Sequence, residues 1–162
     1  MRKTDRWFYL GLLLTVALAL ASCNRRTVYA HYEHTPMTGW DKSDTLAFDV
    51  PAAKVAGAYK EDVGLRVVNT YPFQGLSLVI RQTILPSGYT HSDTVYYNLF
   101  DRKGNTKGPG VSFYQFQFHF NTLQLREGDS LHICVKHNMK REIMPGIADV
   151  GIRIDCENAL NN

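Results

Sequence analysis

Residues 114–121 read Tyr-Gln-Phe-Gln-Phe-His-Phe-Asn, a strict alternation of aromatic and polar side chains. Successive side chains of a β-strand point to opposite faces, so this order puts four aromatic rings on one face and four polar groups on the other. A strand with one apolar and one polar face is typical of an antiparallel sheet that covers a core on one side and meets water on the other. The stretch therefore indicates an all-β fold.

The same period of two recurs on both sides of this stretch, and no helical period lies between the repeats. Proline- and glycine-containing turns separate the segments, and one short helix or turn is expected at 137–143. We predict a single antiparallel β-sandwich of about eight strands, jelly-roll-like, over residues 39–157, followed by a C-terminal tail at 158–162. One closed sheet is the alternative. The other alternating segments are 46–50, 63–67, 76–84, 95–99, 131–135 and 150–154.

The first 22 residues have the layout of a secretory signal peptide, with a basic start and a 15-residue apolar-leaning run from Trp7 to Ala21. That run is shorter than the roughly 20 residues of a membrane-spanning helix. It ends in Leu20, Ala21, Ser22 and Cys23, which fit the bacterial lipobox.

A lipobox predicts a defined chemistry at Cys23. The thiol accepts a diacylglycerol, the two small residues before it allow cleavage, and the freed amine takes another acyl chain. Two or three chains hold a protein stably on a membrane, whereas one chain holds it only marginally. An ordinary cleaved signal and a short signal anchor stopped at Arg25-Arg26 are the alternatives.

The charge of the mature chain is close to zero. Removing residues 1–22 takes three basic and one acidic side chain from 18 and 15, which leaves 140 residues with 15 basic and 14 acidic groups. This balance gives no electrostatic case for nucleic acid. Residues 23–38 are polar and basic at first and are interrupted by Pro36, so we expect them to form the lipidated N-terminus and a tether.

Cys134 and Cys156 remain after Cys23 is modified, and export would carry them to an oxidising compartment. A disulfide between them is one interpretation. Alternation, however, points Cys134 to the face opposite the apolar Ile133, whereas Cys156 shares the face of the apolar Ile154. The two thiols then lie on different faces, so two free thiols are the other interpretation.

Three C-terminal elements resemble the gliding-motility lipoprotein H family (GldH) of Bacteroidetes: a methionine followed by two basic residues, a proline-glycine-isoleucine turn, and a strand that begins aspartate-valine-glycine. Further pieces occur in the same order from the N-terminus, so the resemblance spans most of residues 23–155. The segments that carry it are Gly39-Trp40-Asp41, Asp44-Thr45-Leu46-Ala47-Phe48, Asn69-Thr70-Tyr71-Pro72-Phe73, Leu99-Phe100-Asp101-Arg102-Lys103-Gly104, Met139-Lys140-Arg141, Pro145-Gly146-Ile147 and Asp149-Val150-Gly151-Ile152-Arg153-Ile154.

The resemblance implies an accessory lipoprotein of the gliding apparatus, which is tied to type IX secretion. It implies a lipid-anchored position at the periplasmic face of the outer membrane, support of companion gliding-motility lipoproteins, and no enzymatic activity. Asn24-Arg25-Arg26 lacks the acidic run that surface-exported lipoproteins of this group carry, which favours the periplasmic leaflet.

Other chemistry finds little support in the sequence. His31 and His34 lie three apart, but zinc requires three or four clustered ligands. No nucleophile motif or phosphate-binding loop is present, so we expect no metal, no cofactor, no catalytic residue and no small-molecule substrate.

The alternative function is glycan binding by exposed aromatic side chains. Trp40, Tyr71 and Tyr96 are the candidate contacts for a glycan or a protein partner. The opposing interpretation is that Trp40 and Tyr71 close the ends of the core, because aromatic residues mostly serve burial.

Overall fold

Strands account for all regular structure between Thr27 and Cys156 in the computed structural model, which describes residues 26–157. No helix occurs among these residues, so the prediction of an all-β fold is confirmed. Eight strands have five or more residues and two have only two. They are β1 (Thr27–His34), β2 (Trp40–Asp41), β3 (Leu46–Val50), β4 (Gly57–Val68), β5 (Gly75–Leu85), β6 (Tyr89–Asn98), β7 (Phe113–Leu125), β8 (Ser130–His137), β9 (Ile143–Met144) and β10 (Ile147–Cys156).

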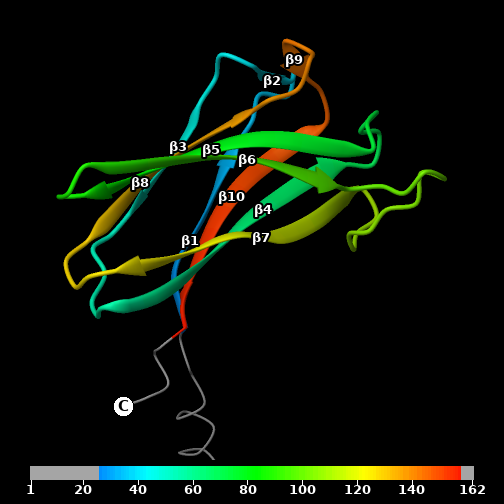
Figure 1. Ribbon diagram of the computed structural model, residues 1–162. Helices are drawn as coiled ribbons and strands as arrows, with labels where there is room; N and C mark the ends of the chain where they lie inside the picture. The colour runs from blue at the N-terminus through cyan, green and yellow to red at the C-terminus, as the bar shows by residue number, and fades with distance from the viewer. Residues whose placement is uncertain (1–25, 158–162) are drawn as a thin grey trace, which may run out of the picture.

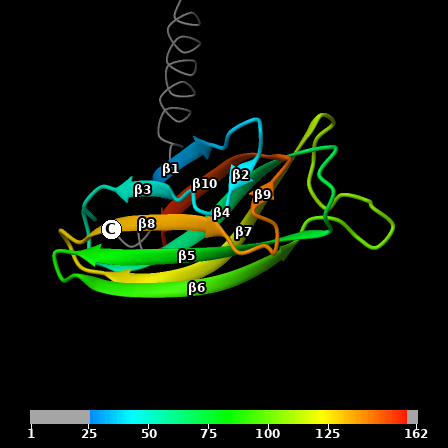
Figure 2. The ribbon, with the colours of Figure 1, turned by 90° about the horizontal axis from the view of Figure 1, so that it is seen from above.

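The eight long strands form two antiparallel sheets packed face to face (Figures 1 and 2). Sheet I has the order β1-β10-β4-β7, and sheet II has the order β3-β8-β5-β6. Among the long strands the first therefore pairs with the last, the second with the seventh, the third with the sixth and the fourth with the fifth. This is one long antiparallel hairpin rolled into two layers, which is the jelly-roll arrangement.

Alternation along each strand builds the core between the sheets. On β5 the side chains of Leu76, Leu78 and Ile80 are fully buried, and on β8 Ile133 and Val135 are as well. The residues between them face outward, as period-two patterning requires. Each fully buried aliphatic side chain contributes about 1.5–3 kcal/mol.

The aromatic stripe of residues 114–120 lies on the core face of β7, as predicted, but only Phe116 is buried, and the other three rings are half-buried. The reason is that β7 is an edge strand of sheet I. Phe118 instead stacks on Tyr97 of β6, with ring centroids 4.3 Å apart and an interplanar angle of 9°. This pair closes the gap between the edges of the two sheets.

The predicted tether at 23–38 is wrong for residues 27–34, which form β1. This strand pairs with β10 from Thr27↔Asp155 to His34↔Asp149. The ring of Tyr32 lies directly against Gly151 of β10 and Gly64 of β4. The contact is so close that a Cβ added at either glycine would fall within 2.7 Å of a ring carbon or of the hydroxyl oxygen. The sandwich therefore begins at Thr27.

The two sulfur atoms that could form a disulfide are free thiols in this structure. Cys134 alternates with the buried Ile133 and Val135 and points away from the core of sheet II. Cys156 is buried at the end of β10 in sheet I. The Cys134–Cys156 bridge is therefore not formed, because the two side chains point to different sides of the sandwich, as the alternation in the sequence indicates.

The lipobox residues Leu20, Ala21, Ser22 and Cys23 lie outside the described residues, so the structure does not test the lipidation. Within 26–157 no helix is long and apolar enough to cross a membrane.

Candidate docking groove at the His34 end

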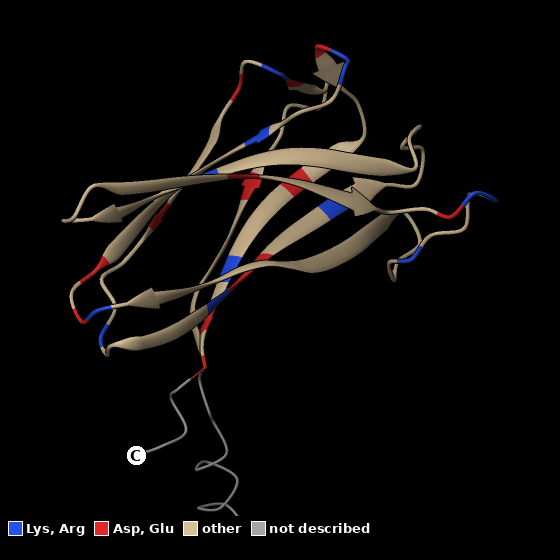
Figure 3. Ribbon diagram, in the orientation of Figure 1, with Lys and Arg blue, Asp and Glu red and all other residues tan. Residues whose placement is uncertain are grey.

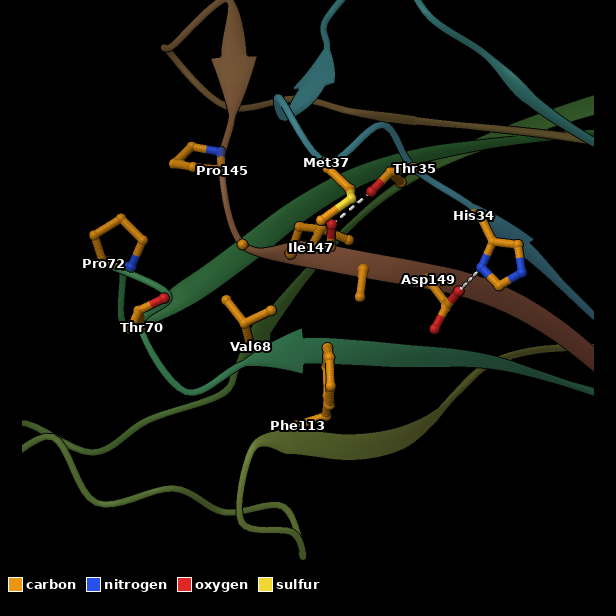
Figure 4. Close-up of a pocket in the computed structure, with 12 residues that line it drawn as sticks. His34, Thr35, Met37, Val68, Thr70, Pro72, Phe113, Pro145, Ile147 and Asp149 are labelled. Atoms are coloured by element: carbon orange, nitrogen blue, oxygen red, sulfur yellow. Dashed lines mark hydrogen bonds and ion pairs between the residues drawn. The ribbon is translucent and has the colours of Figure 1, made fainter.

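The sandwich has two ends, which we name by the ends of β1. At the Thr27 end β1 begins and β10 ends. At the His34 end β1 and β4 end, while β10 and β7 begin. A groove of about 670 Å³ lies at the His34 end of sheet I (Figure 4). Its apolar lining includes Met37, Val68, Pro72, Phe113, Pro145, Ile147 and Ala148, and its polar lining includes His34, Thr35, Thr70 and Asp149.

The floor of the groove is made by the turn that leads into β10. Gly146 has a φ of +84°, which L side chains rarely adopt, and a Cβ there would lie 3.2 Å from Tyr71 Cα and from Val68 Cγ2. The carbonyl of Gly146 accepts a hydrogen bond from Val68 N at 2.9 Å, and Thr35 N donates to the carbonyl of Ala148 at 3.0 Å. These bonds fix three chain segments around one turn.

Two apolar side chains at the groove stand in solvent. Met37 is fully exposed and Phe113 is 52% exposed. Figure 4 shows them on either side of Ile147, which is buried. Exposed apolar side chains beside a recess offer surface that a partner could bury.

A network of polar side chains borders the groove. The side chain of Asp149 is nearly buried, and its two oxygens bond His34 Nδ1 and, at 3.4 Å, Arg66 Nη1. The guanidinium of Arg66 also lies over the ring of Tyr32, 5.1 Å from its centroid. This network compensates the buried carboxylate and presents His34 at the rim.

The aromatic contacts predicted at Trp40 and Tyr71 are wrong. Trp40 is fully buried, packs edge-on against His137 and donates its ring N–H to the carbonyl of Asp44 at 3.2 Å. Tyr71 is also buried, and its hydroxyl donates to the carbonyl of Gly75 at 3.0 Å. Both close the core at the His34 end. Tyr96 is 59% exposed on β6, outside the groove, and stays a candidate contact.

The histidines of β1 do not assemble a metal site. His31 pairs with Glu33 and His34 with Asp149. Among residues 26–157 no group of three or more histidine, cysteine or acidic side chains is placed to hold an ion.

A buried carboxyl lies in the core, away from the groove. Glu61 of β4 is fully buried, and Gln82 Nε2 and Asn121 Nδ2 donate to its Oε2 at 2.9 and 3.0 Å. Glu61 Oε1 and Gln82 Oε1 have no hydrogen-bond partner within the described residues. Burial raises the pKa of Glu61 to about 7, against the opposing effect of the two hydrogen bonds. A protonated Glu61 gains an O–H donor, whereas an ionised Glu61 only accepts hydrogen bonds.

Sequence reasoning missed the groove because its lining comes from segments far apart in the chain. One signal was present: three segments that resemble a known family contribute to it. Thr70 and Pro72 come from the central segment, and Pro145 to Asp149 come from the C-terminal ones.

Two comparisons with known proteins point to one family. The family model described as GldH lipoprotein matches residues 27–154. The match begins at the first residue of β1. A protein of Flavobacterium johnsoniae named gliding motility lipoprotein GldH is 30% identical over 152 residues, which cover 90% of this chain and 94% of that protein.

Solved structures are similar only at low scores. BtGH115A, a family GH115 4-O-methyl-α-glucuronidase, gives a TM-score of 0.45 at 12% identity, and the match covers 85% of this chain and 18% of that one. A family 35 carbohydrate-binding module from Clostridium thermocellum gives 0.38 at 14% identity, with 78% and 87% covered. Likenesses this weak carry no argument about a ligand.

Proposed function

The chain belongs to the GldH lipoprotein family, and from that premise we propose that it is a non-catalytic, lipid-anchored accessory component of the gliding-motility machinery and its associated type IX secretion. Its task is to hold a companion lipoprotein at the membrane. Fold alone does not license this role, which rests on the family and on one site.

The observation that carries the proposal is the groove at the His34 end. It combines the exposed apolar groups Met37 and Phe113 with a rigid floor at Gly146 and a polar rim at His34 and Asp149. An apolar pocket with a few polar groups at its edge suits an anchor side chain from a protein partner, whose neighbouring backbone hydrogen-bonds the rim. We therefore assign the groove to an apolar segment of a partner lipoprotein.

The anchor in this proposal is acylated Cys23, with the lipobox Leu20-Ala21-Ser22 removed together with the rest of residues 1–22. The mature protein then consists of a short lipidated link, the sandwich from Thr27 to Glu157 and a tail at 158–162. Confining both partners to one membrane raises the effective concentration of a weak interaction without any new contact.

The membrane in this proposal is the outer membrane, and the leaflet is the periplasmic one. Asn24-Arg25-Arg26 supports this placement because it lacks an acidic export run.

Crosslinking pull-down from native membranes tests the groove. We expect Phe113→Asp to lower recovery of the partner at least tenfold, because it puts a charge into an apolar contact. Tyr89→Asp is the matched control, since Tyr89 is an aromatic residue of similar exposure outside the groove. It should leave recovery unchanged.

The identity of the captured protein decides the rest of the proposal. Recovery of another gliding-motility lipoprotein or a type IX component by the wild-type bait supports it. Recovery of neither, or equal losses for the two variants, contradicts it.

A further inference from the structure

The link between the acylated residue and the folded domain is very short. Arg26 is already bonded to the sheet, because Cys156 N donates to its carbonyl at 2.8 Å, and Thr27 pairs with Asp155. Only residues 24 and 25 separate Arg26 from Cys23. Three residues of fully extended chain span at most about 11 Å. A lipid on Cys23 therefore holds the Thr27 end of the sandwich within about 11 Å of the bilayer surface.

An apolar recess lies at that same end. It has a volume of about 380 Å³ and lies between the first two residues of β1 and the loop that joins β3 to β4. Val28 and Val55 are 46% and 49% exposed at its opening. Its apolar lining includes Val28, Val50, Ala52, Val55, Leu125 and Ile154.

The recess is rigid. Ala53 of the β3–β4 loop exchanges two backbone hydrogen bonds with the β7–β8 turn: Ala53 N donates to the carbonyl of Asp129 at 2.8 Å, and Gly128 N donates to the carbonyl of Ala53 at 2.9 Å. The hydroxyl of Tyr59 donates to the carbonyl of Val55 at 2.7 Å. Val55 is thus presented from a fixed loop.

Charge at the Thr27 end is mixed (Figure 3). The cations include Arg26, Lys54, Arg126 and Arg153, which pairs with Asp155, and the acidic groups are Glu127, Asp129, Asp155 and Glu157. Such a balance gives no net attraction to anionic headgroups. A contact with lipid at this end must come from apolar burial, with the long stem of Lys54 reaching the headgroups.

We propose that the Thr27 end of the sandwich rests on the leaflet that holds the Cys23 lipid, with Val28 and Val55 at the boundary between headgroups and acyl chains. This inference rests on the proposed acylation of Cys23. β1 runs away from that surface from Thr27 to His34, a span of about 23 Å, to the groove. The contact therefore fixes the groove facing away from the membrane, at a set height.

Tryptophan reporters in the full acylated protein test the contact. Trp7 leaves with the signal peptide, so buried Trp40 is the background fluorophore. Val55→Trp places a reporter at the recess, and Val111→Trp places one at another exposed valine, close to Phe113 in sequence. Each protein is reconstituted into vesicles of phosphatidylethanolamine and phosphatidylglycerol with brominated acyl chains, which quench tryptophan on contact.

We expect the Val55→Trp signal to be quenched at least threefold, in low salt and in 0.5 M salt alike, because the contact is apolar. The Val111→Trp protein should show no more quenching than the wild type. Equal signals from the two reporters would overturn the inference, whether the recess then faces water or is covered by the chain's own acyl group or by a second copy.

Mass spectrometry of the same preparation separates the two proposals. Acylated Cys23 with an unquenched Val55→Trp reporter removes only the bilayer contact. An unmodified Cys23 removes both the contact and the anchor.

Discussion

Glu61 is the residue whose chemistry departs most from its surroundings. A carboxyl inside a core is tolerated when it is neutral or paired, and here it has two amide donors on one oxygen and none on the other. Desolvation raises its pKa to about 7. The pattern in the sequence could have revealed it, because Glu61 is in step with the core residues Val63 and Leu65, and Gln82 with Ile80.

The pH dependence of stability follows from the direction of this shift. The folded pKa of about 7 lies above the ordinary value of 4.5, so the contribution of Glu61 is fully present below pH 4.5 and is lost as the pH rises through 7. The difference amounts to about 3 kcal/mol.

We therefore expect Glu61→Gln to gain about 3 kcal/mol in unfolding free energy relative to the wild type between pH 4.5 and 8. Urea denaturation at each pH measures it. Glu127→Gln, at an exposed turn, should show no such trend. A difference between Glu61→Gln and wild type that does not change with pH would contradict the assignment.

Asp62, whose pKa is lowered by hydrogen bonds and charge despite its burial, contributes stability that is lost only as the pH falls below its ordinary value of 3.8.

Gly146 is the second residue that decides local structure. Gly146→Ala adds a Cβ to a backbone of positive φ that already touches Tyr71 and Val68. Gly88→Ala is its control, since Gly88 also has a positive φ but has open space around it. We expect Gly88→Ala to cost about 1 kcal/mol from the backbone alone and Gly146→Ala clearly more. Equal losses in urea denaturation would mean that the groove floor yields to the added methyl group.

At the scale of elements, the strands predicted from the sequence are those with one buried face. β8 and the Leu76–Gln82 part of β5 alternate strictly because each strand has a neighbour on both sides and a core beneath it. β1 was missed because it is an edge strand with most side chains exposed or half-exposed, so Thr27–His34 carries no apolar alternation. The first half of β6, Tyr89–Thr94, was missed for the same reason.

Because β1 is part of the sandwich, a substitution in it should lower the unfolding free energy, which a substitution in a tether would not do. Tyr32→Ala removes a ring that covers Gly64 and Gly151 and carries the guanidinium of Arg66. We expect a loss of about 2 kcal/mol in unfolding free energy. Tyr89→Ala, at the exposed start of β6, should cost less than about 0.5 kcal/mol. No difference between the two variants in urea denaturation would return residues 27–34 to the role of a linker.

At the scale of the whole molecule, the two-layer fold could be predicted because alternation and turns specify it locally. The groove could not be, since the rolled hairpin brings together residues near 35, 70, 113 and 146. Which aromatic residues are exposed was equally hidden. Trp40 is buried because its strand, β2, pairs with β9 and its ring packs against His137. Tyr71 is buried beside Gly146 and the rings of Phe73 and Phe100. Contacts between distant segments carry no signal in the local pattern.

The resulting molecule has two ends with different tasks in our account. The Thr27 end lies beside the link to Cys23, and the His34 end holds the groove. The central claim is that this groove binds a companion lipoprotein at the membrane.

Site-specific photocrosslinking in living cells tests that claim most directly, with a photoreactive amino acid placed at Met37 in one strain and at Tyr89 in another. The account predicts a crosslink from position 37, and not from position 89, to another gliding-motility lipoprotein identified by mass spectrometry. A silent position 37, or the same crosslinked protein from both positions, would contradict it.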